Sequence, residues 1–155
     1  MFSHLHVHTQ YSLLEASCVP KKLAQKAVDL NMPAVAITDY GNMFGAVEHY
    51  FACESAGVKP IVGLDVFIAP GSRFDKGLRS DGGRLANRKL VLLAQDIEGY
   101  RNLCAISSIG YQEGFYYKPR VDYETLAKYS KNIIALSGGA YGEVPWTYLN
   151  KGKDE

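Results

Sequence analysis

The stretch Ala34-Val-Ala-Ile-Thr-Asp39 decides the fold class, because five small or β-branched residues lead directly into a carboxylate. A short run without charged residues is typical of a strand buried in a parallel sheet. Before it, Val19–Leu30 repeats apolar residues at helical spacing, with Pro20 in the first turn, where its missing N–H costs nothing. After it, Ala46–Ala56 indicates a second helix that Gly57 ends.

The same alternation continues in both directions along the chain. It predicts further strands and helices at Leu5–Thr9, Pro60–Ala69, Leu90–Ala94, Asp96–Tyr111 (a helix with Asp96 as N-cap), Tyr123–Tyr129 (a helix) and Asn132–Ser137. Strands separated by helices indicate an α/β fold with a mainly parallel sheet. A closed barrel of such units takes about 250 residues. We therefore expect a single domain over residues 1–155 that is either an open sheet or the first part of a larger fold.

Composition excludes several classes of protein. The chain has 155 residues and a formal charge of +1, from 17 Lys+Arg against 16 Asp+Glu, which excludes both an acidic disordered tail and a uniformly basic nucleic-acid binder. Its three cysteines show no C-x-x-C spacing, so neither a disulfide framework nor a zinc knuckle is indicated. The chain shows no signal-peptide pattern and no apolar run of about 18 residues. These features predict a cytoplasmic protein without membrane contact.

Three histidines near the N-terminus are candidate metal ligands. His4, His6 and His8 occupy alternate positions of the first predicted strand, so their imidazoles are expected on one face. Neutral imidazole suits zinc, iron and manganese. The alternative is a histidine-rich edge strand, because an isolated His-x-His pair is a weak motif.

Carboxylates at the following strands strengthen the metal hypothesis. Asp39 ends one strand, and the C-terminal edge of a parallel sheet is where ligands bind. Asp65 lies inside an apolar run, where a carboxylate has to be paired, hydrogen-bonded or metal-bound. Either aspartate alone fits a cap or an ion pair. The complete candidate set is His6, His8, Glu15, Asp39 and Asp65.

Several segments carry a resemblance to a known family. They are His6-Val-His-Thr9, Tyr11-Ser-Leu-Leu14, Thr38-Asp-Tyr-Gly-Asn-Met43, Gly57-Val-Lys-Pro-Ile-Val-Gly63, Glu113-Gly-Phe-Tyr-Tyr-Lys-Pro-Arg120 and Ala135-Leu-Ser-Gly-Gly139. They resemble the polymerase-and-histidinol-phosphatase (PHP) domain at the N-terminus of bacterial replicative DNA polymerase III alpha subunits. The fourth and fifth segments favour the polymerase branch over the histidinol-phosphatase branch.

The resemblance implies a distorted, TIM-like (β/α)7 barrel of about 200 to 300 residues. This chain would then be its first part, a PHP domain over residues 1–155 without the polymerase palm, fingers and thumb. Members of the family hold up to three metal ions, such as Zn²⁺, Mn²⁺ or Mg²⁺, at the C-terminal ends of the strands. The cluster serves phosphoester hydrolysis, proposed as a proofreading 3′–5′ exonuclease.

Carried over by position, His6 and His8 match the first ligand pair, Glu15 stands at an acidic position and Asp39 matches the motif aspartate. The pattern departs from the family at Tyr40 in place of a histidine, Asp65 in place of a glutamate, Lys89 near a histidine position and Gly139 in place of a cysteine. A further Asp-x-His pair would lie beyond residue 155.

These departures predict an eroded metal site. Neutral tyrosine is a poor zinc ligand at neutral pH, and an ammonium at Lys89 adds positive charge beside a cationic cluster. We expect partial or no occupancy, with one ion on His6, His8 and a carboxylate as the fullest state. Lys89 is a candidate for an ion pair with Asp65 or Asp39 that fills a former metal position.

The segment from Arg73 to Lys89 has six basic residues against two acidic ones and contains several glycines. Such loops can bind along the phosphate backbone of a nucleic acid, although a solvated surface loop is the alternative. The candidate nucleic-acid contacts are Arg73, Lys76, Arg79, Arg84 and Arg88. Similarly, the aromatic residues 115–117 either stack on bases or anchor a turn against the core.

The leading interpretation is a PHP domain in DNA replication with a mainly structural or partner-docking role. The resemblance implies as partners the rest of the polymerase alpha subunit, the proofreading exonuclease subunit and DNA through the holoenzyme. One alternative is a metal-dependent 3′–5′ exonuclease or phosphoesterase active on DNA. Another is a free-standing small phosphatase, which the polymerase-type segments disfavour. The resembled parent chain is a DNA-directed DNA polymerase, a transferase, and whether this stretch is itself an enzyme stays open.

Overall fold

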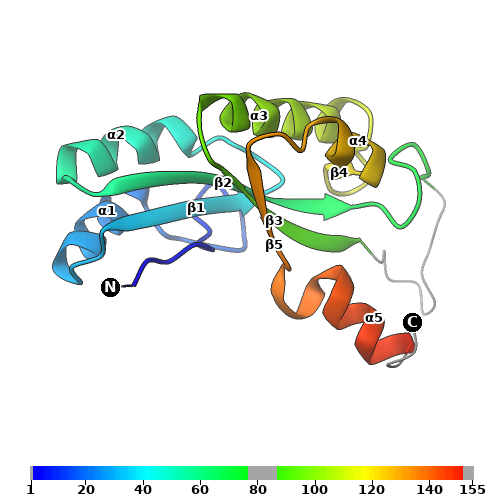
Figure 1. Cartoon of the computed structure of the whole chain (residues 1–155), viewed down its shortest axis with the longest axis horizontal. Helices are drawn as coiled ribbons and strands as arrows, with labels where there is room; N and C mark the ends of the chain where they lie inside the picture. Colours follow the sequence, from blue (N-terminus) through cyan, green and yellow to red (C-terminus); the bar gives the residue numbers. More distant parts are fainter. Residues whose placement is uncertain (1, 77–86, 152–155) are drawn as a thin grey trace.

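A five-stranded sheet forms the centre of the molecule (Figure 1), in a computed structural model that describes residues 2–76 and 87–151. The strands are β1 (Ala34–Tyr40), β2 (Lys59–Ile68), β3 (Arg88–Ala94), β4 (Arg120–Val121) and β5 (Ile133–Leu136). The helices are α1 (Pro20–Asp29), α2 (Ala46–Ala56), α3 (Ile97–Gln112), α4 (Tyr123–Lys128), the 3₁₀ turn η1 (Gly139–Tyr141) and α5 (Glu143–Lys151). The strand order is β1-β2-β3-β5, and β4 pairs with β2.

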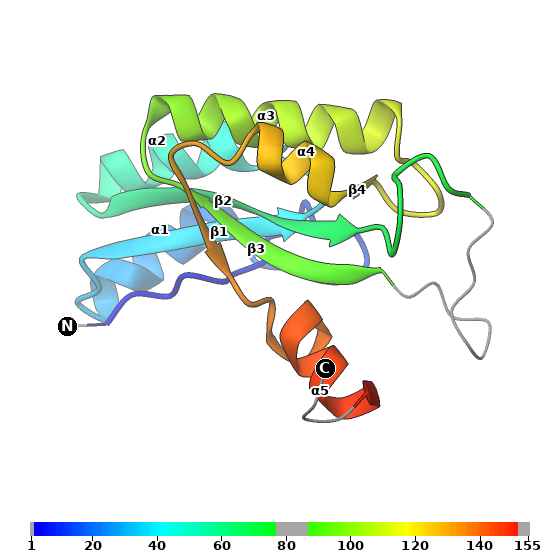
Figure 2. The ribbon, with the colours of Figure 1, turned by 45° about the vertical axis from the view of Figure 1, so that its right-hand side comes forward.

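The sheet is mixed, so the expectation of a mainly parallel sheet is wrong. β2 runs parallel to β1 and β4, whereas β3 is antiparallel to both β2 and β5. A parallel pair needs a crossover connection, usually a helix, and the described part of the β2–β3 connection contains no helix. β3 therefore returns antiparallel. The described strands form an open sheet (Figures 1 and 2), so the α/β class is confirmed while the TIM-like barrel stays a prediction.

The predicted first strand, Leu5–Thr9, is wrong as a regular strand, although this segment does lie along β1 (Figure 2). The backbone N–H of Ala36 donates to the His4 carbonyl at 2.9 Å, and that of Thr38 donates to the Val7 carbonyl at 2.8 Å. The donors are two residues apart and the acceptors three, so the ladder slips by one residue. His6 and His8 nevertheless face the same carboxylate, that of Asp65, whereas His4 is not part of this group.

Side chains alternate between the two faces of the sheet and divide it into a core face and a site face. On the core face, Leu64, Val66 and Leu92 pack with Leu103 and Ile106 of α3. Helices α2, α3 and α4 lie on this side (Figure 1). The site face carries, in register across β1, β2 and β3, the residues Tyr40, Asp65, Phe67, Lys89 and Val91.

Helix boundaries follow the local signals of the sequence. Pro20 stands in the first turn of α1, and Gly57 ends α2 at a left-handed φ of 72°. Asp96 caps α3, since its Oδ1 accepts the backbone N–H groups of Glu98 and Gly99 at 2.9 Å each. Beyond β5, η1 and α5 lie in a region for which the sequence pattern predicted no element.

Removing the α3 cap tests this account of the helix start. We expect Asp96→Ala to lower the free energy of unfolding by about 1–2 kcal/mol, because two backbone N–H groups lose their acceptor and Asn132 loses its partner at Oδ2. The matched control Asp29→Ala, at the exposed end of α1, should change stability by less than about 0.5 kcal/mol. Urea denaturation followed by circular dichroism measures both, and equal losses would contradict the capping role.

Candidate metal centre

Three potential metal-ligating atoms converge on the site face of the sheet. Nε2 of His6 and Nε2 of His8 lie 3.2 Å apart, and each faces Oδ2 of Asp65, at 3.1 and 3.2 Å. The irregular N-terminal segment supplies the two imidazoles, and β2 supplies the carboxylate. Within the described part of the chain, this triad is the one group of three or more His, Cys, Asp or Glu side chains close enough to share an ion.

The contacts of the triad fit a divalent cation better than they fit hydrogen bonds. Each imidazole Nε2 either donates one hydrogen bond or accepts one, so no proton assignment satisfies all three contacts at full strength. Ligands about 2.0–2.1 Å from a tetrahedral zinc ion would lie about 3.3 Å from one another, close to the spacing of these three atoms. In addition, Oδ1 of Asp65 is buried and has no hydrogen-bond partner among the described residues. The residues therefore fit an ion.

Tyr40 and Lys89 occupy the space beside the triad. The Tyr40 ring stacks on the His8 ring, with centroids 3.9 Å apart and planes at 23°. Nζ of Lys89 lies 3.8 Å from the centroid of the Tyr40 ring. The prediction of an ion pair between Lys89 and Asp65 or Asp39 is wrong. Among the described residues, no carboxylate oxygen lies within 4.0 Å of Nζ of Lys89. The ammonium rests on aromatic rings instead.

Asp39 is not part of the triad. Its carboxylate is buried, and it accepts the Thr9 backbone N–H at 2.6 Å, the Thr9 hydroxyl at 2.7 Å and the Ser12 hydroxyl at 2.7 Å. These bonds fasten the turn that follows His8 to the end of β1. The sequence had no signal for this role, since Thr9 and Ser12 are ordinary turn residues until the fold brings them to Asp39.

Glu15 also lies apart from the triad. Its Oε1 accepts a hydrogen bond from Nζ of Lys118 at 3.1 Å, and both side chains are more than two-fifths exposed. An ion pair with this exposure contributes little to stability. Gly139, at the remaining position where the family pattern is broken, lies in η1 and offers no side-chain ligand.

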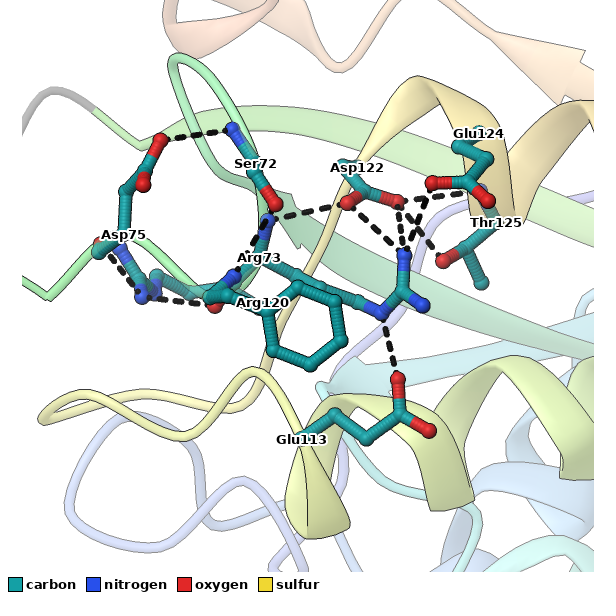
Figure 3. Close-up of polar contacts among 9 residues, drawn as sticks. Ser72, Arg73, Asp75, Glu113, Arg120, Asp122, Glu124 and Thr125 are labelled. Carbon is teal, nitrogen blue, oxygen red and sulfur yellow. Dashed lines mark hydrogen bonds and ion pairs between the residues drawn. The ribbon is translucent and has the colours of Figure 1, made fainter.

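Arg73, the first candidate nucleic-acid contact, is held in a cluster of carboxylates (Figure 3). Its Nε donates to Glu113 at 2.6 Å, and an η nitrogen donates to both oxygens of Asp122, at 3.0 and 3.1 Å, and to Glu124 at 3.4 Å. The bond to Glu113 is the main cause that raises the pKa of Arg73. The guanidinium ties the start of the β2–β3 connection to α3 and α4, so its charge is already neutralised.

Asp122 receives five hydrogen bonds within the same cluster. Burial alone would raise the pKa of Asp122, but the Arg73 backbone N–H, the Thr125 N–H and hydroxyl, and the Arg73 guanidinium together lower it to about 2. Arg120 is buried next to this cluster and donates to the backbone carbonyls of Gly114, Arg73 and Asp75. The described part of the basic segment before residue 77 is thus held by internal contacts.

The other candidate nucleic-acid contacts are placed differently. The guanidinium of Arg88 stacks over Trp146 of α5, 3.3 Å from the ring centroid, and burial lowers its pKa. Lys76 is exposed at the end of the described segment. Arg79 and Arg84 lie outside the described residues.

The aromatic turn before β4 lines a recess next to the triad. The cavity has a volume of about 210 Å³, and its walls include Tyr40, Phe67, Phe115, Tyr117 and Lys118. Phe115 and Tyr117 are 48% and 73% exposed, so they are not the buried anchors of a turn. The recess therefore has exposed aromatic side chains in its walls.

Comparison with known proteins identifies the family. The sequence model of one protein family, the PHP domain, matches residues 4–155 of this chain. The chain belongs to the PHP domain family. The PHP domain is 49% identical over 97% of its length to the DNA polymerase III subunit alpha of Chlamydia trachomatis, and 42% identical over 96% to that of Aquifex aeolicus.

The PHP domain spans only 12–13% of the length of these curated relatives. A solved structure of an amidohydrolase from Chromobacterium violaceum aligns with a TM-score of 0.49 and 21% identity, over 70% of this chain and 33% of that chain. Nothing about the site follows from a likeness of that level. Among the described residues, no helix combines the length and apolar character that crossing a membrane requires.

Substitution of Asp39 separates anchoring from metal binding. We expect Asp39→Asn to lower the free energy of unfolding by about 2 kcal/mol, because charge-assisted hydrogen bonds to three buried donors become neutral or are lost. Zinc affinity, measured by isothermal titration calorimetry on the folded variant, should fall with this stability but not be lost, because Asp39 positions the segment that carries His6 and His8 and is not itself part of the triad. Loss of zinc binding with unchanged stability would instead make Asp39 a ligand.

The Asp122 cluster predicts a specific acid dependence of stability. The folded-state pKa is about 2, below the ordinary value of 3.8. The stabilisation, about 2 kcal/mol, is therefore fully present above pH 4 and is lost as the pH falls toward 2. Urea denaturation between pH 2 and 5 should show a flatter pH dependence for Asp122→Asn than for the wild type. Asp29→Asn, at an exposed carboxylate, should keep the wild-type slope, and identical slopes for all three proteins would contradict the assignment.

Proposed function

We propose that this chain is the PHP domain of a replicative DNA polymerase III alpha subunit in the bacterial cytoplasm. Its role in DNA replication is mainly structural: it braces the polymerase chain and docks a partner. The proposed partners are the rest of the alpha subunit, the proofreading exonuclease subunit and DNA through the holoenzyme. The high identity to curated alpha subunits over nearly the whole chain supports this context.

The observation that carries the structural role is the small size of the metal centre. Two-metal phosphoester cleavage needs two ions about 3.5–4 Å apart, with ligands for both. In the described part of the chain, His6, His8 and Asp65 form one three-atom cluster. The carboxylate of Asp39 is already engaged by three donors. The space beside His8 is filled by Tyr40 and Lys89. The site is therefore proposed to hold one ion at most.

The residues of the triad would bind that ion, with zinc or manganese as the metals best suited to two imidazoles and a carboxylate. When bound, an ion would supply Lewis-acid polarisation of a phosphate oxygen. The chain's own contribution is to orient the imidazoles: Tyr40 stacks on His8, and the anchored turn after His8 fixes the segment. This geometry also ties the N-terminal segment to β2, which strengthens the domain as a scaffold.

A second candidate function is a metal-dependent 3′–5′ exonuclease, which the aromatic recess favours. Bases of single-stranded DNA stack on aromatic side chains, and the recess presents Phe115 and Tyr117 on the rim and Tyr40 against the triad. Lys118 adds a positive charge that suits a phosphate, which would have to compete with Glu15 for the ammonium. This function requires hydrolysis at the triad, which the scaffold function does not.

Metal analysis and an exonuclease assay on the same preparations distinguish the two functions. We expect the purified domain to bind no more than one Zn²⁺ or Mn²⁺ per chain, and His8→Ala to lose that binding while it stays folded. Neither protein should shorten a 5′-labelled single-stranded oligonucleotide above background in either metal. Chelator-sensitive cleavage that His8→Ala abolishes would overturn the scaffold proposal and establish the exonuclease.

A further inference from the structure

Lys89 holds a positive charge on aromatic rings within the candidate metal centre. Its Nζ lies 3.8 Å from the centroid of Tyr40, and 5.5 Å from the centroids of both Phe67 and Tyr141. In the described chain no carboxylate oxygen comes within 4.0 Å of it. Aromatic faces attract a cation but leave its net charge intact. The ammonium therefore keeps its full electrostatic effect on its surroundings.

The backbone around Lys89 fixes where this charge lies. Lys89 is in register with Phe67 of β2, and it forms an isolated bridge with Gly142. Gly138 passes so close that a Cβ there would lie 2.4 Å from the Lys89 carbonyl oxygen. With strands on one side and the turn into α5 on the other, the backbone of Lys89 is held in the position from which its ammonium reaches the Tyr40 ring.

The charge is close enough to act on an ion in the triad. The Tyr40 centroid is 3.9 Å from the His8 centroid and 3.8 Å from Nζ of Lys89, so the ammonium is at most 7.7 Å from the centre of a candidate ligand ring. A unit charge and a divalent ion about 9 Å apart repel each other enough to weaken binding roughly fivefold in a water-like medium. At the effective dielectric of a protein surface the factor exceeds about a hundredfold.

We propose that Lys89 is a built-in cation that weakens divalent metal binding at the triad and restricts the site to a single ion. This inference rests on the proposed one-ion triad. The ammonium lies beside the ligands on the same face of the sheet, so a second divalent ion there would meet its repulsion at short range. Lys89 acts through its charge and is not itself a ligand.

Neutralising Lys89 without shortening it tests the proposal. Isothermal titration calorimetry with Zn²⁺ and with Mn²⁺, on the folded domain, gives affinity and stoichiometry together. We expect Lys89→Met to bind the first ion at least about fivefold more tightly than the wild type. Lys89→Arg, which keeps the charge, should stay within about twofold of the wild type. Lys89→Gln serves as a second neutral variant if the methionine variant does not fold.

Lys128→Met is the matched control, because Nζ of Lys128 also lies over a tyrosine ring, 5.3 Å from the centroid of Tyr129. Lys128 belongs to α4, one of the helices over the core face (Figure 1). Removing the charge of Lys128 should therefore leave the metal affinity of the triad unchanged. Equal affinities of wild type and the neutral Lys89 variants would overturn the proposal, as would a gain that Lys128→Met shares.

The outcomes separate this proposal from the proposed function. If no variant binds an ion, the proposed role of Lys89 is refuted and the proposed scaffold function is unaffected. If the wild type binds two ions, both the role of Lys89 and the one-ion centre are refuted. If the neutral variants bind the ion more tightly and the domain nevertheless cleaves DNA, the role of Lys89 is supported and the scaffold function is refuted.

Discussion

The carboxylate of Asp39 fastens the N-terminal segment to the end of β1, and the candidate metal centre depends on that attachment. The segment itself is not a regular strand, because its ladder to β1 slips by one residue. Its position is set instead by three short hydrogen bonds from Thr9 and Ser12 to Asp39. With the end of the segment fixed in this way, the imidazoles of His6 and His8 reach Asp65 of β2. A buried aspartate thus positions two histidines without being a ligand itself.

The centre combines an attractive and a repulsive element for cations. Asp65 is buried, and one of its oxygens has no partner among the described residues, which favours a cation at the triad. Lys89 brings a positive charge to the neighbouring space, supported by Tyr40 and Phe67. The balance between them distinguishes this centre from one built for two ions. With the proposed role of Lys89, such a domain would keep the scaffold of a metal centre and lose much of the driving force for binding an ion.

The sequence predicted the elements of the fold well where a local signal sets them. The apolar run at Ala34–Thr38, the cap at Asp96 and Gly57 after α2 all act through their own neighbourhood, and the structure confirms each. The predicted direction of β3 was wrong, because strand direction depends on the connection between strands and not on the strand's own residues. At the site, the sequence predicted the convergence of His6, His8 and Asp65 from residue spacing and from the cost of burying a carboxylate, although the strand expected at Leu5–Thr9 does not form. The engagement of Asp39 by Thr9, and of Arg73 by Asp122, depends on contacts between distant segments that no spacing reveals.

Three atoms of this PHP domain are proposed to form a site for one ion. Anomalous scattering from crystals soaked in Zn²⁺, recorded on both sides of the zinc absorption edge, tests it most directly. We expect one anomalous peak at bonding distance from Nε2 of His6, Nε2 of His8 and Oδ2 of Asp65, with Lys89 still on the Tyr40 ring. Two or more peaks in the centre, or a peak bonded to Asp39, would contradict it.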